Sequence, residues 1–363
     1  MAQIVQASAY RKRLRKWFWS DRWLSKIAIG VAGAVIVLRG FGVFQLFELT
    51  AYDQLFQRRS LEPQDNRIVL VSLDDTDLQR LGTGGMLSDQ RLAEVLTLIK
   101  SRQPRAIGLD IYRDLPVAPG SEQLKDVFEN TPQLIGIETL SDSDSPGVMA
   151  PPALKAKQQV GFNNVVIDLD GLVRRNTLFI KPKDQPVHQS FALKLVLKYL
   201  EPDHIRLKVS RSKHTQLNGV EFPPLNPNDG AYINADSLRG YQILANPRSS
   251  LPIEHQVSPF AQLPLSVLLE SNRSPQGQER MTNLLSDRIV LLGSTAQSSN
   301  DFFLTSHSSR RGGNAERMSG VELQGQFVSQ ILSAVLDGRS LIRFWDDPSE
   351  WVWILGWSWL GAF

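Results

Sequence analysis

The sequence contains no cysteine, and only five of its 363 residues are histidine. Without thiols the chain has no disulfide bonds, no thiol nucleophile and no thiolate metal ligands. No two histidines have the spacing of a helical metal site, so we expect solvated histidines and neither a metal nor another cofactor. The histidines are His188, His204, His214, His255 and His307.

Two motifs of common enzymes are also missing. Ser294 follows a predicted strand, but its surroundings lack the Gly-x-Ser-x-Gly pattern that exposes a nucleophilic serine in hydrolases. The glycine-rich residues 82–85 lack the lysine of a phosphate-binding loop. We therefore predict that the chain is not an enzyme complete in itself. An exported enzyme using Asp74, Asp110 and Asp301 is the weaker alternative.

The body of the chain lacks an excess of basic charge. Residues 1–22 hold six Lys or Arg against Asp21, a net charge of +5. Because the whole chain carries +3, the remaining residues carry −2. Nucleic-acid binding needs a basic face that neutralises phosphates, so nucleic acid is not an expected partner.

A basic segment followed by an apolar one is typical of a membrane anchor. Residues 27–38 and 40–49 are largely apolar and are separated only by Arg39; together they reach the roughly 20 residues that cross a bilayer. Arg39 lies close enough to the end of this stretch to reach the lipid headgroups. We predict a transmembrane helix over residues 23–49. Tryptophans that favour the membrane interface lie on its basic side, at Trp17, Trp19 and Trp23.

The same features set the expected topology. Basic residues favour the cytoplasmic side, which places a tail of residues 1–22 in the cytoplasm and a domain of residues 50–345 outside the plasma membrane. Residues 351–363 are uncharged and rich in tryptophan, and we interpret residues 350–363 as the start of a second transmembrane helix. A cleaved signal peptide and a buried core helix are the alternatives for the first apolar stretch.

Between these ends the pattern predicts an α/β fold, with a mostly parallel sheet and flanking helices. Strands and helices alternate along the chain, which is typical of βαβ units. Short β-branched runs predict strands over residues 67–73, 106–111, 133–137 and 288–292, with weaker strands over 232–234 and 242–244. Apolar residues at helical spacing predict helices over residues 88–100, 121–129, 190–200 and 321–336.

Residues 161–180 predict a β-hairpin inserted in this fold, because two extended runs flank an Asp-Gly pair at position 170 that favours a tight turn. Asp168 and Asp170 also resemble the start of a calcium loop, but the later ligands are missing, so we favour the turn. Arg174 and Arg175 are neighbours on one predicted strand and should point to opposite faces. We therefore expect only one of them to pair with Asp168 or Asp170.

Acidic and hydroxyl side chains follow several of the predicted strands. Ligands of parallel α/β sheets bind beyond the carboxyl ends of the strands, so these residues predict a crevice at that edge. Its acidic character suits a cation, an amine or a polyol unless an arginine enters it. The alternative is that the carboxylates only cap helices and turns. The candidate ligand-binding residues are Asp74, Asp75, Arg91, Asp110, Asp168, Asp170, Arg174, Ser294 and Asp301.

Six short segments between residues 45 and 340 carry a family resemblance. They are Phe47-Glu48-Leu49 with Ala51-Tyr52-Asp53, Leu73-Asp74-Asp75, residues 106–110, residues 161–175, Ser190-Phe191-Ala192, and residues 289–294 with Asp301 and Gly320-Val321-Glu322. In this order they resemble the CHASE sensory domain of the second type. The resemblance implies an extracytoplasmic sensor that precedes a bacterial cyclase, histidine kinase or Ser/Thr kinase. It also implies one membrane helix before the domain and usually three after it.

We therefore predict the sensory part of a bacterial membrane receptor, which binds an unknown small molecule or protein as its signal. Receptors of this kind act as dimers, so we expect a homodimer joined near the lipid bilayer. The interface candidates are Phe47, Tyr52, Leu55 and Phe56. The alternative is a structural or assembly module that binds a partner protein or itself.

Overall fold

A computed structural model describes residues 24–82, 86–141, 146–233, 240–248, 258–308 and 317–362. The chain forms two compact units. The smaller unit contains the described residues up to Tyr52, together with segments from Asn226–Leu238 and Arg343–Phe363. The larger unit comprises Asp53–Leu225 and Arg239–Ile342. The expected cytoplasmic tail of residues 1–22, which contains Trp17 and Trp19, lies outside the described residues, as does Trp23.

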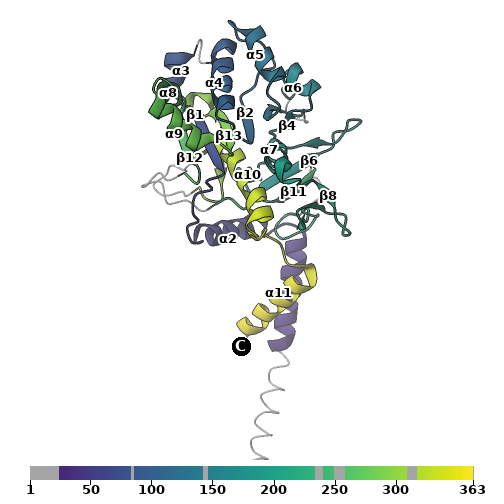
Figure 1. Cartoon of the computed structure of the whole chain (residues 1–363). Coiled ribbons are helices and arrows are strands. Elements are labelled where there is room, and N and C mark those ends of the chain that lie inside the picture. The colour runs from purple at the N-terminus through teal and green to yellow at the C-terminus, as the bar shows by residue number, and fades with distance from the viewer. Residues whose placement is uncertain are drawn as a thin grey trace, which may run out of the picture. The chain divides into compact units, whose positions relative to one another are not determined.

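The larger unit is built on a six-stranded sheet in which every pair of neighbours is parallel (Figure 1). Strand β13 comes last in the sequence among the six strands of this sheet. It nevertheless occupies the middle of the sheet, because it pairs with β1 on one side and β2 on the other. The sheet order is β12 (Ala261–Pro264), β1 (Ile68–Leu73), β13 (Ile289–Ser294), β2 (Ala106–Asp110), β3 (Leu134–Glu138) and β4 (Val160–Phe162).

Helices cover both faces of this sheet. Side chains of β1 alternate between two cores: Ile68 and Leu70 join one, and Val69 and Val71 join the other. On the first face pack α7 (Phe191–Leu200) and α10 (Gly320–Leu336). The second face is covered by α4 (Asp89–Ser101), α5 (Ser121–Glu129), α8 (Leu265–Ser271) and α9 (Pro275–Leu285). Two shorter helices are α3 (Asp75–Leu81) and α6 (Pro152–Ala156).

Three small sheets complete the larger unit. Two are antiparallel, and the third combines a parallel with an antiparallel pair. The first contains β11 (Tyr241–Leu244), β6 (Arg175–Ile180) and β7 (His188–Gln189). The second contains β10 (Val220–Phe222), β9 (Thr215–Leu217) and β8 (Lys208–Val209). The third contains β15 (Met318–Ser319), β14 (Phe302–Thr305) and β5 (Leu172–Val173).

The predicted α/β class and its main elements are confirmed. All four principal strands and all four predicted helices are present, with ends displaced by no more than two residues. The weak strand over residues 242–244 also exists, as β11. The other weak strand is wrong, because residues 232 and 233 are not extended strand, and residue 234 lies outside the described ranges.

The predicted β-hairpin over residues 161–180 is wrong, although the turn inside it is correct. The backbone N–H of Asp168 bonds to the carbonyl of Leu172, and Gly171 has a φ of +85°. The two flanking runs nevertheless do not pair with each other. Strand β4 joins the edge of the large sheet beside β3, whereas β5 pairs with β14. Each run therefore has a better partner elsewhere in the fold.

The predicted continuous transmembrane helix over residues 23–49 is also wrong in its geometry. The helix Leu24–Gly40 ends in a Schellman motif, in which Val43 N–H bonds to the Leu38 carbonyl and Gly42 N–H to that of Arg39. Gly42 has a φ of +77°, which glycine adopts readily. A second helix, α2 (Gln45–Gln57), then leaves at an angle of 92°.

This break bears on membrane crossing. Within the described ranges, no single helix is both long and apolar enough to span a bilayer. The pair formed by Leu24–Gly40 and α2 meets the criterion of length and composition only when both helices are taken together.

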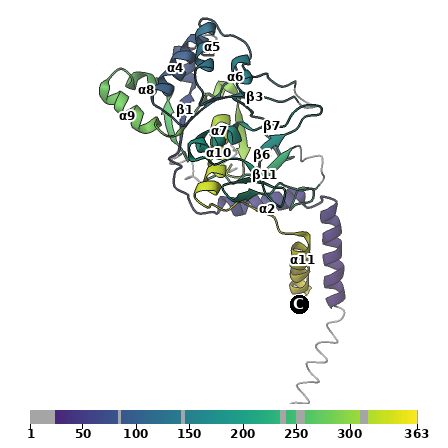
Figure 2. The ribbon, with the colours of Figure 1, turned by 45° about the vertical axis from the view of Figure 1, so that its right-hand side comes forward.

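Arg39 is held by protein groups of the smaller unit. Its guanidinium donates to Glu48 Oε1 at 2.7 Å, to Glu350 Oε2 at 2.5 Å and to the carbonyl of Gly230 at 2.8 Å. Glu350 belongs to α11 (Asp347–Ala362), the second apolar helix of this unit (Figure 2). The arginine that interrupts the apolar run therefore joins the first helix, α2 and α11 through ion pairs.

Candidate functional site

Two predicted site residues, Asp110 and Asp301, come together at the carboxyl edge of the large sheet. Asp110 is the last residue of β2 and lies in register with Gly293 of β13. Asp301 directly precedes β14, and its carboxylate lies against Gly320 at the first turn of α10. Glycine is required at both neighbouring positions, because a Cβ on Gly293 would crowd Val321 and one on Gly320 would overlap the Asp301 carboxylate.

Both carboxyl groups have raised pKa values, and the charge of Asp301 contributes to the shift of Asp110. The pKa of Asp110 is raised to about 7, mainly because burial disfavours its charged form and also because Asp301 is negative; the hydrogen bond from Asn163 opposes this. Surrounding protein also raises the pKa of Asp301. Water reaches Asp301 more freely than the half-buried Asp110, so screening leaves Asp110 as the more strongly perturbed group.

A polar rim from neighbouring strands surrounds this pair. Asn163, after β4, directs its amide nitrogen toward Asp110 at 3.5 Å and its oxygen toward the hydroxyls of Tyr112 and Thr139, both at 3.0 Å. Tyr112 and Thr139 also share a 2.5 Å hydrogen bond. The pKa of Tyr112 is raised by burial first, and further by the charges of Asp110 and Asp301. These groups form one electrostatic unit with the acidic pair.

Within the described residues, the Asp110–Asp301 pair has no basic counterion. In the described part of the chain, neither carboxylate has a Lys, Arg or His within ion-pair distance. Within the same residues, no three His, Cys, Asp or Glu side chains are arranged to hold a metal ion. Two carboxylates with hydroxyl and amide neighbours can accept hydrogen bonds from an ammonium group or a polyol.

The three other predicted residues at this edge make capping contacts. Asp74 accepts a 2.7 Å hydrogen bond from Asp77 N–H and caps α3. Asp75 accepts bonds from Gln297 N–H and Ser298 Oγ, and the Ser298 bond in particular lowers its pKa. Ser294 Oγ accepts a bond from Ala296 N–H. These contacts match the capping alternative for these three residues.

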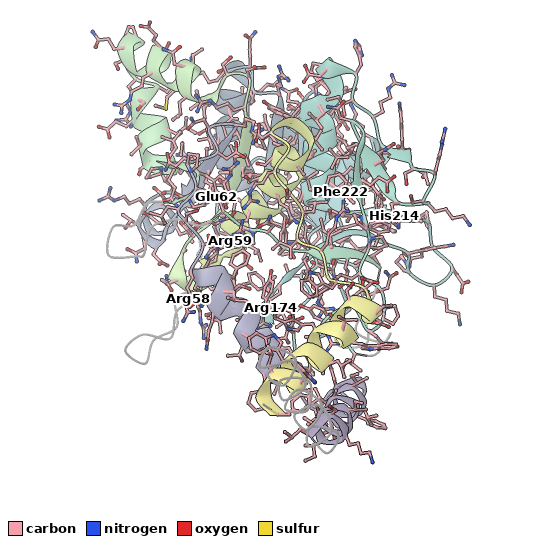
Figure 3. All side chains as sticks on the ribbon, turned by 90° about the horizontal axis from the view of Figure 1, so that it is seen from below. Arg58, Arg59, Glu62, Arg174, His214 and Phe222 are labelled. Atoms are coloured by element: carbon pink, nitrogen blue, oxygen red, sulfur yellow. The ribbon has the colours of Figure 1, made fainter. Side chains whose placement is uncertain are left out.

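Asp168, Asp170 and Arg174 belong to a separate buried network in the larger unit; Figure 3 labels Arg174. Arg174 is 1% exposed and donates to Asp53 at 2.6 Å, to Asp168 at 2.9 Å and to Asp170 at 2.5 Å. Burial opposes its charge, but the hydrogen bonds to Asp53 and Asp170 raise the pKa of Arg174 overall. Arg175, which is also buried, pairs with the second oxygen of Asp168 at 2.6 Å.

The expectation that only one of the two arginines would pair is therefore wrong. The strand is interrupted at Arg174, where the chain passes from β5 to β6 and so from one small sheet to another. The alternation of side chains is lost at that point, and both guanidinium groups turn inward.

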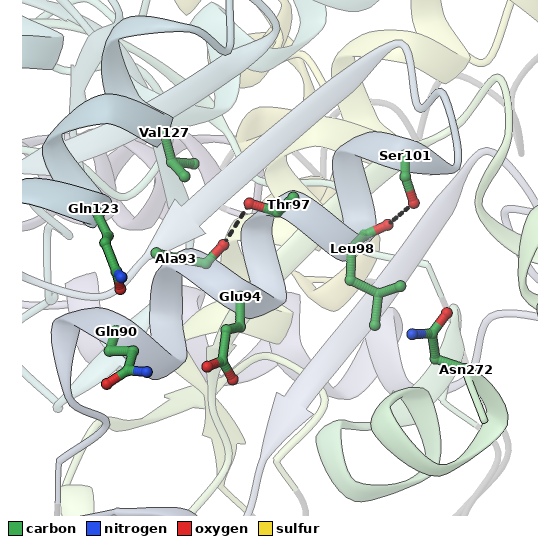
Figure 4. A pocket seen from close by; sticks show the side chains of 9 residues that line it. All are labelled: Gln90, Ala93, Glu94, Thr97, Leu98, Ser101, Gln123, Val127 and Asn272. Atoms are coloured by element: carbon green, nitrogen blue, oxygen red, sulfur yellow. Dashed lines mark hydrogen bonds between the residues drawn. The ribbon is translucent and has the colours of Figure 1, made fainter. Parts of the chain in front are cut away.

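Arg91 lies elsewhere, on the exposed surface of α4, where it pairs with Glu94 at 2.6 Å. An open groove runs along the same helix between Gln90, Glu94, Gln123 and Asn272 (Figure 4). It contains neither residue of the acidic pair. Its single charged side chain is already paired with Arg91, so we favour the acidic pair as the candidate site.

Several important polar residues gave little signal in the sequence. Arg248 is buried and donates to Ser329, Ser333 and Asp65 at 2.8, 2.7 and 3.5 Å. Ser329 and Ser333 lie four residues apart on α10, so the sequence indicates that they share one face of the helix. It does not indicate that Arg248 is their common partner. His307 was expected to be solvated; instead burial lowers its pKa to about 4, and its ring packs edge-on against Phe56.

The comparisons with known proteins point to one family. The family model of the CHASE2 domain matches residues 30–363. The chain belongs to the CHASE2 family. CHASE2 domains are generally extracellular sensory domains of signalling proteins, and the match includes no catalytic domain. Neither the curated proteins nor the solved structures contain a significant match to this CHASE2 chain.

Proposed function

We propose that this CHASE2 chain is the extracytoplasmic sensor of a membrane receptor, and that it binds its signal at the Asp110–Asp301 pair. The observation that carries the proposal is an acidic pair with raised pKa values at the carboxyl edge of a parallel sheet, for which the described part of the chain supplies no counterion. An organic amine or a polyol fits better than a bare metal ion, because only two carboxylates converge.

The site lies where a bound ligand could act on a long helix. Asp301 contacts Gly320, the first residue of α10, and α10 is buried along nearly its whole length. Along the chain, α10 is followed by ten residues and then by α11. We consider two conformations of the domain that differ in the placement of α10. A ligand with a higher affinity for one conformation would shift the population toward it and so move the helix. In the proposed receptor, the helix that begins as α11 receives this shift and transmits it toward a cytoplasmic cyclase or kinase.

A ligand screen tests the binding site. We expect one class among polyamines, polyols and divalent cations to raise the melting temperature of the chain, since a ligand at 100 times its Kd adds about 2.7 kcal/mol. Asp301→Asn should abolish that shift. Asp75→Asn is the matched control, because Asp75 is an acid at the same edge engaged in capping, and it should retain the shift. No shift with any class would favour the assembly-module alternative.

A topology reporter tests the membrane arrangement. Alkaline phosphatase is active only outside the cytoplasm, so a fusion after Pro223 in the larger unit should be active. A cytoplasmic reporter, such as a fluorescent protein that does not mature outside, should give the opposite result at the same position. An active cytoplasmic reporter together with a silent phosphatase would refute an extracytoplasmic sensor.

The receptor is also proposed to act as a homodimer, because output domains of this kind work in pairs. Among the interface candidates, Phe56 is buried in the larger unit against His307, which makes it unsuited to an interface. Leu55 is exposed and is the candidate retained for the interface.

A further inference from the structure

An exposed apolar surface follows the bend between the helix Leu24–Gly40 and α2. Phe41, Val43, Leu46 and Phe47 are 80%, 54%, 53% and 74% exposed. We call these four residues the bend surface. Single exposed apolar residues are ordinary in soluble proteins, but four within one short segment, two of them aromatic, mark an interaction surface.

Helix α2 is apolar on both sides. Leu49 and Phe56 are buried, whereas Leu46 and Phe47 face solvent. The exposed side carries no exposed charged residue: Leu46, Phe47, Ala51 and Leu55 lie beside Thr50, Gln54 and Gln57, and the hydroxyl of Thr50 is satisfied by the carbonyl of Leu46 within the helix. One side of α2 is thus covered by protein. The other side exposes no charged group, so it suits a partner that binds through apolar contact and not through ion pairs.

The geometry of the bend favours a lipid surface as that partner. The Schellman motif at Gly42 and the Arg39–Glu48 ion pair both join the two helices across the turn. When the helix Leu24–Gly40 lies along the bilayer normal, an angle of 92° directs α2 along the membrane surface. A helix in that position buries its apolar side at the boundary between headgroups and acyl chains.

Residues suited to the membrane–water interface lie next to Arg39 in the smaller unit. Arg39 pairs with Glu350 of α11, and the next residue, Trp351, is 49% exposed. Tryptophan prefers the membrane–water boundary, as do charged groups that close an apolar segment. The bend surface is therefore close in the structure to a second group of residues suited to that boundary.

We propose that the bend surface lies in the lipid headgroup region, so that α2 rests on the outer leaflet as an interfacial helix. The proposal rests on the membrane anchoring included in the proposed function. A second copy of the chain is the competing occupant. It is less favoured, because none of the four side chains carries a charge or hydrogen-bonding group that would fix the register of two copies.

Site-directed spin labelling tests this proposal directly, because the chain has no native cysteine. The full chain is reconstituted in phosphatidylcholine vesicles with a nitroxide on Leu46→Cys or Phe47→Cys. Relaxation by oxygen, which concentrates in lipid, is compared with relaxation by a water-soluble nickel chelate. We expect oxygen to dominate at both positions. A label on Val209→Cys, an exposed apolar residue of β8 in the larger unit, should show nickel dominating.

The outcomes separate the alternatives. If the vesicles carry the protein in flotation but both labels behave like the Val209→Cys control, the bend surface does not contact lipid and the proposal is wrong. Dipolar broadening between labels, lost on dilution with unlabelled chain, would assign the surface to a second copy. A chain that fails to float with vesicles would refute membrane anchoring itself. Val43→Cys provides a further position if one label disturbs folding.

Discussion

At pH 8 the Asp110→Asn variant should be more stable than the parent chain, by up to about 4 kcal/mol, and this gain should vanish below about pH 4. The folded chain holds the Asp110 proton up to a pKa of about 7, whereas an unfolded aspartic acid releases it near 3.8. Between these values the folded state binds more protons than the unfolded state. The stability of the parent chain therefore falls as pH rises through this window.

Asparagine keeps the shape of the side chain and removes the charge, so it escapes this loss. Partial exposure of Asp110 to water makes the quoted gain an upper value. Urea denaturation of the detergent-solubilised chain at pH 4 and pH 8 measures the difference. Asp114→Asn serves as the control, because Asp114 is an exposed acid four residues further on, and its effect should be small at both pH values. A gain independent of pH would show that Asp110 is not the destabilised carboxylate.

Replacement of Arg174 by methionine should destabilise the chain by about 3–5 kcal/mol. The side chain is buried and neutralises Asp53, Asp168 and Asp170, so its loss leaves carboxylates in a low-dielectric environment with too few partners. Methionine fills most of the volume, which limits the contribution of a cavity. The shift of the denaturation midpoint measures this cost.

The matched control is Arg91→Met on the surface of α4. The Arg91–Glu94 pair is exposed and three residues apart on one helix, so its loss should cost less than about 1 kcal/mol. A second test combines Arg174→Met with Asp168→Asn and Asp170→Asn. Removing two of the stranded charges should recover part of the loss. Equal effects of Arg174→Met and Arg91→Met would contradict a structural role for the buried network.

The sequence predicted the large sheet well because its strands and helices carry strong local patterns. Strand β1 and helix α5 are examples: the first is apolar at every position except Ser72, and the second matches its predicted range, Ser121–Glu129. The acidic pair was also predictable in part. The rule that carboxyl ends share an edge brought Asp110 and Asp301 together, but it did not distinguish them from Asp74, which caps α3.

The errors concern features that depend on partners distant in sequence. Residues 161–180 have the pattern of a hairpin, and only the presence of β3 and β14 explains why the two runs separate. The partners of Arg39 are similar, since Glu350 lies 311 residues away. Local periodicity contains no information about such contacts, so the ion pair between Arg39 and Glu350 could not be derived from it. The bend at Gly42 is an exception, because its Schellman motif is local and glycine at that position is a helix-ending signal.

The central position of β13 has a consequence for the biogenesis of the protein. Leu73, at the end of β1, bonds to Thr295, which is synthesised 222 residues later. Until β13 has emerged, β1 and β2 lack the strand that joins them, and each presents an open edge able to pair with another chain. The sheet of an exported chain would thus close only after most of the domain had been translocated. Until that point the open strand edges favour aggregation, so a chaperone that binds the emerging chain would have most effect at this stage.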